Sequence, residues 1–273
     1  MADELNTTIF LHIPKAGGNS LLEFLRPNYP EDAHFDVSLG LKYVDRLNEL
    51  ETMPAEQQSR FRFISGHLPF GIHQFLPQQS RYITVLRDPI DRVVSHYYFV
   101  REQRKHPLHD AVMSKNMTVA DYVTSGLSGE LNNGMVRLIC GRAESDSLRG
   151  HAPCEDGDLR IALDHLRDHF EVVGLLEQID ATQQLLSRVF GWPERSSVRK
   201  NKTKVRKSTA SLKKKEREII ASHNAMDIEL YRWASERFEN DCAKYGISIA
   251  PQERGLTQRL LQPFDFARRY LGC

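Results

Sequence analysis

A lysine followed by two glycines is the first feature of this chain that could do chemistry, because it could bind phosphate. Lys15 precedes Gly17 and Gly18, and Asn19 and Ser20 then open a predicted helix. Glycines permit the backbone angles of a tight turn, and the N–H groups at a helix N-terminus attract anions. The alternative is an ordinary strand–turn–helix corner with a solvated lysine. The stretch indicates a loop for a phosphate-bearing nucleotide, to which Lys15 adds a mobile positive charge.

The order of these residues disfavours an ATP- or GTP-hydrolysing loop. In that loop the lysine follows the last glycine, and the next hydroxyl residue holds a magnesium ion. Here Lys15 comes before Gly17 and Gly18. A phosphate loop remains possible, but the lysine–hydroxyl pair that grips a β- or γ-phosphate with its metal is missing. An NTPase or an ordinary kinase is therefore disfavoured.

A second group of residues could hold one more phosphate. Arg87 follows the apolar run Tyr82–Leu86, Asp88 and Pro89 are typical of the first positions of a helix, and Ser95 lies two turns further on. An arginine can fork around a phosphate with two N–H groups, and a serine hydroxyl can add another donor. The alternative is a surface ion pair between Arg87 and a nearby aspartate, beside a solvated serine.

A histidine follows another predicted strand. His67 comes directly after the strand-like run 61–66. Ligands of parallel α/β sheets gather outside the carboxyl ends of the strands, so this is an informative position. Histidine exchanges protons near neutral pH. His67 is therefore either a hydrogen-bonding residue of the structure or a general base.

Eleven basic residues lie between positions 195 and 217. Residues 198–209 show neither a helical nor a strand-like apolar period, so we expect a loop there. A run of charge of this kind is either a solvated face or a loop that folds over an anionic ligand.

Alternating strands and helices must position these groups. Apolar runs predict strands at 9–13, 61–66, 82–86 and 170–175, and amphipathic spacing predicts helices at 20–26, 41–50, 89–99, 119–124, 131–139, 159–169, 179–190 and 212–238. The alternation predicts the α/β class, as a single-domain, P-loop-like three-layer fold with a mainly parallel central sheet flanked by helices. We expect one domain over residues 1–273, in which about 239–273 form a peripheral C-terminal strap.

Composition narrows the classes of partner and compartment. The 273 residues carry a formal net charge of +1, which gives no general attraction for nucleic acid. No apolar run approaches the roughly 20 residues of a membrane span, and the first residues are acidic where a signal peptide would be basic and then apolar. We expect a cytoplasmic protein, and a Golgi lumenal one only if an N-terminal anchor precedes this sequence. The four cysteines match no metal-ligand spacing, so we expect reduced thiols, with a Cys140–Cys154 bond as the alternative in an oxidising compartment.

The two phosphate-binding stretches together resemble those of the sulfotransferases that use 3′-phosphoadenosine 5′-phosphosulfate (PAPS). The resemblance is to the carbohydrate-modifying branch, and within it to the uronyl/heparan-sulfate 2-O-sulfotransferase type. In that family a P-K-x-x-x-[ST]-S-like loop binds the 5′-phosphosulfate, and an R-D-P-x-x-R-x-x-S-x-Y-Y segment binds the 3′-phosphate. The first motif is matched by Pro14, Lys15, Ala16, Gly17, Gly18, Asn19 and Ser20, and the second by Arg87, Asp88, Pro89, Arg92, Ser95, Tyr97 and Tyr98. A G-H pair before the second motif resembles Gly66 and His67, and the matches extend over roughly residues 7 to 240.

The resemblance implies a role for each of these groups. PAPS would be the co-substrate, and no metal would be needed. His67 would be the catalytic base, while Lys15 would stabilise the departing 5′-phosphate. The residues that would contact the nucleotide are Lys15, Ala16, Gly17, Gly18, Asn19, Ser20, Arg87 and Ser95, with Thr203, Arg206 and Ser208 from a basic loop that closes over it. The acceptor would be a hydroxyl group of a saccharide or glycan.

Two other classes of function fit parts of the sequence. A nucleotide kinase would share the phosphate loop, but would need magnesium and a differently placed lysine. A noncatalytic module that binds anionic polymers would use the basic segment, but would have no use for the paired phosphate stretches.

Overall fold

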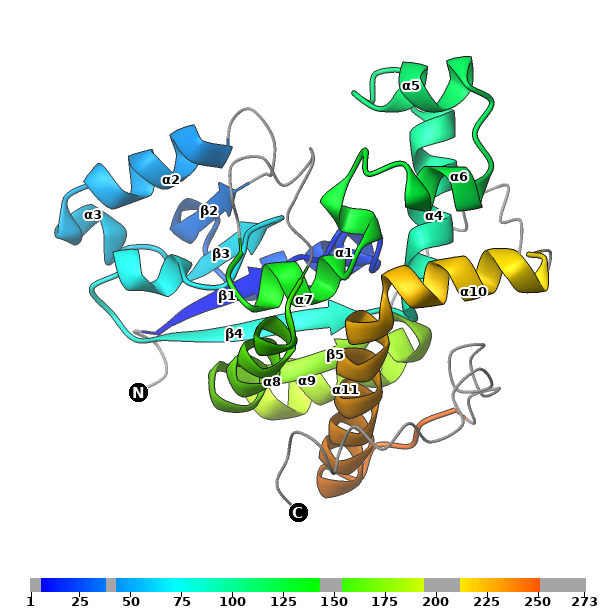
Figure 1. Cartoon of the computed structure of the whole chain (residues 1–273). Helices are drawn as coiled ribbons and strands as arrows, with labels where there is room; N and C mark the ends of the chain where they lie inside the picture. The colour runs from blue at the N-terminus through cyan, green and yellow to red at the C-terminus, as the bar shows by residue number, and fades with distance from the viewer. Residues whose placement is uncertain (1–5, 38–42, 143–153, 194–211, 251–273) are drawn as a thin grey trace.

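Five parallel strands form one sheet in the order β2-β3-β1-β4-β5 (Figure 1). The computed structural model describes residues 6–37, 43–142, 154–193 and 212–250. The strands are β1 (Thr7–Leu11), β2 (His34–Val37), β3 (Phe63–Gly66), β4 (Ser80–Leu86) and β5 (Phe170–Leu175). The predicted parallel sheet is therefore confirmed, with the first strand of the chain at its centre.

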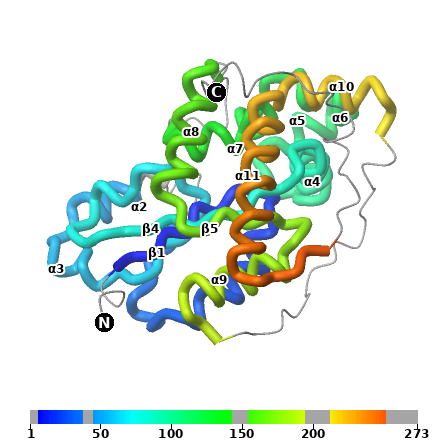
Figure 2. The backbone as a smooth tube through the Cα atoms, turned by 90° about the horizontal axis from the view of Figure 1, so that it is seen from below, coloured from blue at the N-terminus to red at the C-terminus, as the bar shows by residue number. Residues whose placement is uncertain are grey.

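Helices cover both faces of this sheet. Figure 2 shows α9 on one face and α8 on the other, with α11 packed beside β5. Because both faces are covered, all five residues of β1 are buried, and its apolar run needs no polar alternation. The helices are α1 (Gly18–Leu25), α2 (Tyr43–Thr52), α3 (Ala55–Gln58), α4 (Pro89–Glu102), α5 (His109–Ser114), α6 (Val119–Thr124), α7 (Gly134–Ile139), α8 (Asp156–His169), α9 (Ile179–Phe190), α10 (Lys214–His223) and α11 (Ala225–Lys244). Short 3₁₀ turns are η2 (Arg26–Asn28), η3 (Glu31–Ala33), η4 (Ile72–Phe75), η5 (Gly129–Leu131) and η6 (Leu176–Gln178). The single-domain α/β prediction is confirmed.

The start of α4 follows the predicted chemistry. The Asp88 carboxylate accepts hydrogen bonds from the backbone N–H groups of Ile90 and Asp91, and Pro89 occupies the first helical position. This cap satisfies two of the N–H groups that every helix start leaves without a backbone partner. The helix therefore begins directly after Arg87 and leaves that side chain at the end of β4.

The single helix expected over 212–238 is two helices, α10 and α11, which meet at Asn224. The Asn224 side chain is fully buried; it donates to the carbonyls of Leu131 and Ile220 and accepts from the N–H of Asn133. Leu131 and Asn133 lie about ninety positions earlier in the sequence, so a local periodicity could not reveal these two contacts. The break is a tertiary effect.

Two other expectations need correction. No strand is expected in residues 31–60, yet His34–Val37 form β2, the outermost strand on one side of the sheet, which pairs with β3. The helix expected over 131–139 begins only at Gly134, because Leu131 ends a 3₁₀ turn and Asn133 adopts a left-handed conformation with φ 52°.

A second hydrophobic cluster supports α4 away from the sheet. Residues of α4, α6 and α10 pack there, among them Val93, Val100, Tyr122 and Ile220. Within the described ranges no helix is long and apolar enough to cross a membrane. Helix α11 continues to Lys244, and residues 251–273 lie outside the described ranges, so the C-terminal strap stays a prediction.

Candidate functional site

The three predicted groups lie at the carboxyl ends of three adjacent strands. In the sheet register Leu11 of β1 pairs with Gly66 of β3 on one side and with Thr84 of β4 on the other. The β1–α1 loop (residues 12–17), His67 and Arg87 follow these pairs within three residues. The structure therefore brings the predicted residues to one edge of the sheet, the edge formed by the carboxyl ends of the strands. The lysine loop lies between the other two groups.

The β1–α1 loop has the shape of an anion-binding turn. Lys15 and Gly17 both adopt left-handed conformations, with φ of 66° and 80°. Left-handed backbone is uncommon for a residue with a side chain, so Lys15 is held there against a cost of about 1 kcal/mol. Helix α1 begins at Gly18, slightly earlier than predicted, which places Asn19 and Ser20 in its first turn. Because these residues lie in the first turn, no carbonyl of the helix accepts a hydrogen bond from their N–H groups. These N–H groups can therefore bind an anion.

Gly18 is required because the ring of His12 occupies the place of a side chain. A Cβ added at Gly18 would lie 1.8 Å from Nε2 of His12, far inside contact distance. His12 is buried at the end of β1, and burial, helped by electrostatic repulsion from His67 and Lys15, lowers its pKa to about 3. His12 is thus a neutral packing residue beneath the loop.

Substitution of Gly18 tests this packing. Gly18→Ala is expected to destabilise the fold by about 1–3 kcal/mol, because the buried imidazole must move. Urea unfolding measures the cost, and Gly157→Ala is the matched control, since nothing lies within 4 Å of a Cβ there. An equal cost for both substitutions would show that loss of glycine flexibility, not contact with His12, is responsible.

Arg87 is buried and directed at the β1–α1 loop. Its Nη1 donates to the Lys15 carbonyl at 3.0 Å, and only 6% of the residue is exposed. A solvated surface pair, the alternative drawn from the sequence, is inconsistent with this burial. Ser95 lies half-buried on α4, one turn before Phe99, and Nζ of Lys15 lies 3.8 Å above the Phe99 ring. Lys15 thus links the loop to the face of α4 that carries Ser95.

The Lys15 ammonium at this edge of the sheet loses its proton more readily than a free lysine does. Burial lowers the pKa of the Lys15 ammonium, and the neighbouring Arg87 guanidinium lowers it further, while Glu130 and Glu102 oppose the shift. Like charges held together in a partly buried place are costly without a counterion. An anion bound beside Lys15 and Arg87 would offset this repulsion.

His67 presents one ring nitrogen as a possible base. Its Nδ1 lies 2.8 Å from the carbonyl oxygen of His12. A carbonyl only accepts hydrogen bonds, so Nδ1 carries the proton and Nε2 of the neutral ring keeps its lone pair. The rings of His12 and His67 lie 4.2 Å apart, which fixes the orientation of His67.

His73, another histidine near this part of the sequence, lies elsewhere in the fold. Its Nδ1 contacts the Tyr82 hydroxyl at 2.9 Å, near the amino end of β4. It is therefore at the opposite edge of the sheet from His67 and cannot share a substrate with Lys15.

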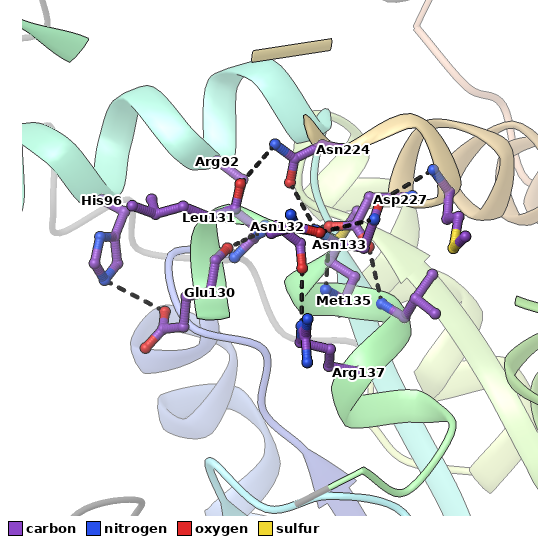
Figure 3. A network of polar contacts seen from close by, with 12 residues as sticks. Arg92, His96, Glu130, Leu131, Asn132, Asn133, Met135, Arg137, Asn224 and Asp227 are labelled. Atoms are coloured by element: carbon purple, nitrogen blue, oxygen red, sulfur yellow. Dashed lines mark hydrogen bonds and ion pairs between the residues drawn. The ribbon is translucent and has the colours of Figure 1, made fainter. Parts of the chain in front are cut away.

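Arg92, part of the matched R-D-P-x-x-R motif, has a structural role. Only 1% of it is exposed; it forms an ion pair with Asp227 of α11 at 3.3 Å and donates to the Glu130 carbonyl. Figure 3 shows this ion pair within a network that joins α4, η5, α7 and the start of α11. Arg92 therefore holds the helix that carries Ser95 in place.

Glu177 is a supporting residue that sequence reasoning missed. It follows β5, accepts from the Asp88 N–H at 3.0 Å and from the Tyr231 hydroxyl at 2.9 Å, and burial raises its pKa. The only feature of the local sequence that could have indicated this role is the position of Glu177 shortly after a predicted strand. Through these contacts Glu177 ties the start of α4, next to Arg87, to α11.

The predicted contacts from the basic segment, Thr203, Arg206 and Ser208, lie outside the described residues. The described chain resumes shortly before α10, which packs against α4 and α6. The C-terminal end of the basic segment therefore lies in a helix that packs on α4, the helix that carries Ser95. The roles of Thr203, Arg206 and Ser208 stay predictions.

Comparisons with known proteins find similarity to sulfotransferases. Residues 7–138 match the family model of the sulfotransferase domain. A heparin sulfate O-sulfotransferase of Drosophila melanogaster is 22% identical over 263 residues, which cover 87% of this chain and 73% of the relative. The crystal structure of mouse sulfotransferase SULT7A1 complexed with PAP superposes with a TM-score of 0.41 and 18% identity, covering 71% of this chain and 61% of that one.

Proposed function

We propose that this chain, of which residues 7–138 match the sulfotransferase domain, transfers the sulfuryl group of PAPS to a hydroxyl group of a saccharide acceptor. The observation that carries the proposal is the convergence of the lysine loop, the buried Arg87 and His67 at adjacent strand ends. The saccharide class rests on the Drosophila relative, which is a heparin sulfate O-sulfotransferase.

Each group has a task in an in-line displacement. PAPS supplies the sulfuryl group and a bisphosphate leaving group. The N–H groups at the start of α1 and the Lys15 ammonium stabilise the negative charge that grows on the 5′-phosphate oxygen as its bond to sulfur breaks. Arg87 and Ser95 hold the 3′-phosphate.

His67 completes the transfer as general base. Nε2 takes the proton of the acceptor hydroxyl while that oxygen forms its bond to sulfur, and the bisphosphate leaves. The hydrogen bond from Nδ1 to the His12 carbonyl keeps the tautomer that this step needs and stabilises the imidazolium that results.

Nucleotide preference tests the proposal. We expect adenosine 3′,5′-bisphosphate to bind at least about 30-fold tighter than AMP, because pairing of its 3′-phosphate with a buried arginine contributes on the order of 2 kcal/mol. Arg87→Lys should abolish most of this preference, since an ammonium cannot form the planar fork. Isothermal titration with bisphosphate, AMP and ATP measures all three affinities.

The matched control is Arg60→Lys, because Arg60 is a 70% exposed side chain far from this edge of the sheet. It should leave the preference unchanged. Equal affinity of the wild-type protein for AMP and the bisphosphate would overturn the proposal, and tighter binding of magnesium-ATP would favour a nucleotide kinase.

A further inference from the structure

The ammonium of Lys15 rests on the face of the Phe99 ring. Nζ lies 3.8 Å from the centroid of that ring. Among the residues that the structure describes, no carboxylate forms an ion pair with this ammonium, so the ring is its direct partner. A cation is attracted electrostatically to the negative face of an aromatic ring. The place of the Lys15 side chain therefore depends on a residue that neither phosphate-binding motif includes.

The Phe99 ring lies on the face of α4 that is assigned to the nucleotide. Phe99 comes four positions after Ser95, so the two side chains share one face of the helix. The residue remains 36% exposed, although it is large and apolar. A cation above a ring is covered on one side only, and the N–H groups on its other sides can donate to a phosphate. Lys15 can therefore rest on Phe99 and meet a 5′-phosphate at the same time.

A neutral histidine supports the ring of Phe99. After α4 the chain turns back, with the His106 N–H donating to the Gln103 carbonyl at 2.8 Å, and the His106 ring meets Phe99 at 5.7 Å and 83°. Nδ1 of His106 accepts from the Leu108 N–H at 3.2 Å. Burial lowers the pKa of His106, and Lys15 adds to the shift, while Glu130 opposes it. His106 thus packs against the ring without placing another positive charge beside Lys15.

We propose that Phe99 is a positioning residue that holds the charged side chain of Lys15 toward the 5′-phosphate, both before and after the nucleotide binds. The inference rests on the proposed function, in which Lys15 stabilises the departing 5′-phosphate. A lysine side chain on its own samples many rotamers, and ordering it opposes binding. A lysine that already rests on the ring loses less freedom when the phosphate arrives.

Graded removal of the negative charge from the ring face tests this role in the full chain. Phe99 is replaced by phenylalanines that carry one, two and three ring fluorines, which withdraw electrons from the ring face and change its size little. Affinity for adenosine 3′,5′-bisphosphate, measured by titration calorimetry, should fall stepwise and reach a loss of about two- to fivefold with three fluorines. A residue with a merely structural role would show no such gradient.

The reactivity of Lys15 gives a second readout that needs no nucleotide. A ring that no longer attracts the ammonium favours the neutral amine, so acetic anhydride should acylate Lys15 about two- to fivefold faster at a fixed pH in the trifluorinated protein. Mass spectrometry of the peptide that contains Lys15 measures this rate. The fluorines leave in place the other charged and titratable groups that interact with Lys15, which are Arg87, Glu130, Glu102, His12, His96 and His106.

Matched variants separate the contact from other effects of the ring. The same fluorines at Phe190, whose ring lies 4.1 Å from the Arg81 guanidinium at the other edge of the sheet, should change neither readout. Phe99→Trp offers a stronger negative face and should bind at least as well as the wild type, whereas Phe99→Leu should bind like the trifluorinated protein. In a Lys15→Ala background the fluorines at position 99 should have no effect on affinity.

Three results would overturn the proposal. Equal affinity along the fluorine series would make Phe99 a packing residue only. Tighter binding with added fluorine would show that Lys15 must leave the ring to reach the phosphate. An undiminished fluorine effect in Lys15→Ala would assign that effect to another group. If the wild-type protein does not bind the bisphosphate, the proposed function fails, whereas the acylation series still tests the contact between Phe99 and Lys15.

Discussion

Replacing His67 by alanine is expected to slow sulfuryl transfer by about 10²- to 10⁴-fold, the usual contribution of a positioned general base. Affinity for adenosine 3′,5′-bisphosphate should hardly change, because His67 follows β3, whereas the groups assigned to the nucleotide follow β1 and β4. Single-turnover assays with a working acceptor, combined with titration of the bisphosphate, measure the two effects separately.

His73→Ala is the control for this substitution. It removes an imidazole near the amino end of β4, so the rate for each folded molecule should stay near the wild-type value. Near-normal turnover in His67→Ala would assign the base to another group and leave His67 as a hydrogen-bonding residue at the end of β3.

Lys15→Ala should impair binding and rate together. The ammonium meets both the bound phosphosulfate and the charge that develops on the leaving oxygen, so we expect about tenfold or more weaker binding and a further loss in kcat of about 10²-fold. Alanine is the suitable replacement because it keeps a Cβ in the left-handed conformation of residue 15. Glycine would relieve that strain and confuse the comparison.

Lys214→Ala provides a comparison for the loss of one positive charge. Lys214 is 88% exposed at the start of α10, so its removal should change neither constant by more than a small factor. A Lys15→Ala variant with weaker binding but an unchanged kcat would show that the lysine binds the substrate and its transition state equally, which contradicts its assignment to the leaving group.

The strands of the sheet centre and the cap of α4 could be predicted because local chemistry determines them. Buried parallel strands read as apolar runs, as in Tyr82–Leu86, and Asp88 before Pro89 is a strong helix start. β2 could not be found in this way, because it has only four residues, two of them His34 and Asp36, and its pairing with β3 decides its conformation.

From the sequence, a residue could be assigned to the candidate site only where it directly follows a predicted strand. His67 and Arg87 have such positions, and the sheet order then brings them to the lysine loop. Glu177 carries no motif, and its contacts with Asp88 and Tyr231 join segments far apart in sequence. Gly18 was predicted as part of the loop, but the contact with His12 that requires a glycine there is visible only in three dimensions.

The central place of β1 in the sheet has a consequence for the synthesis of the protein. Thr8 pairs with Phe63, 55 residues later, and Thr7 pairs with Ser80, 73 residues later. At roughly 5–20 residues per second, the apolar strand Thr7–Leu11 waits about 4 to 15 seconds for its second neighbour to be made. Pairing over such separations is also slow in itself. The apolar segment that leads into the lysine loop is thus made before both of its neighbours in the sheet, and until β4 has been made it is a segment that a chaperone could protect.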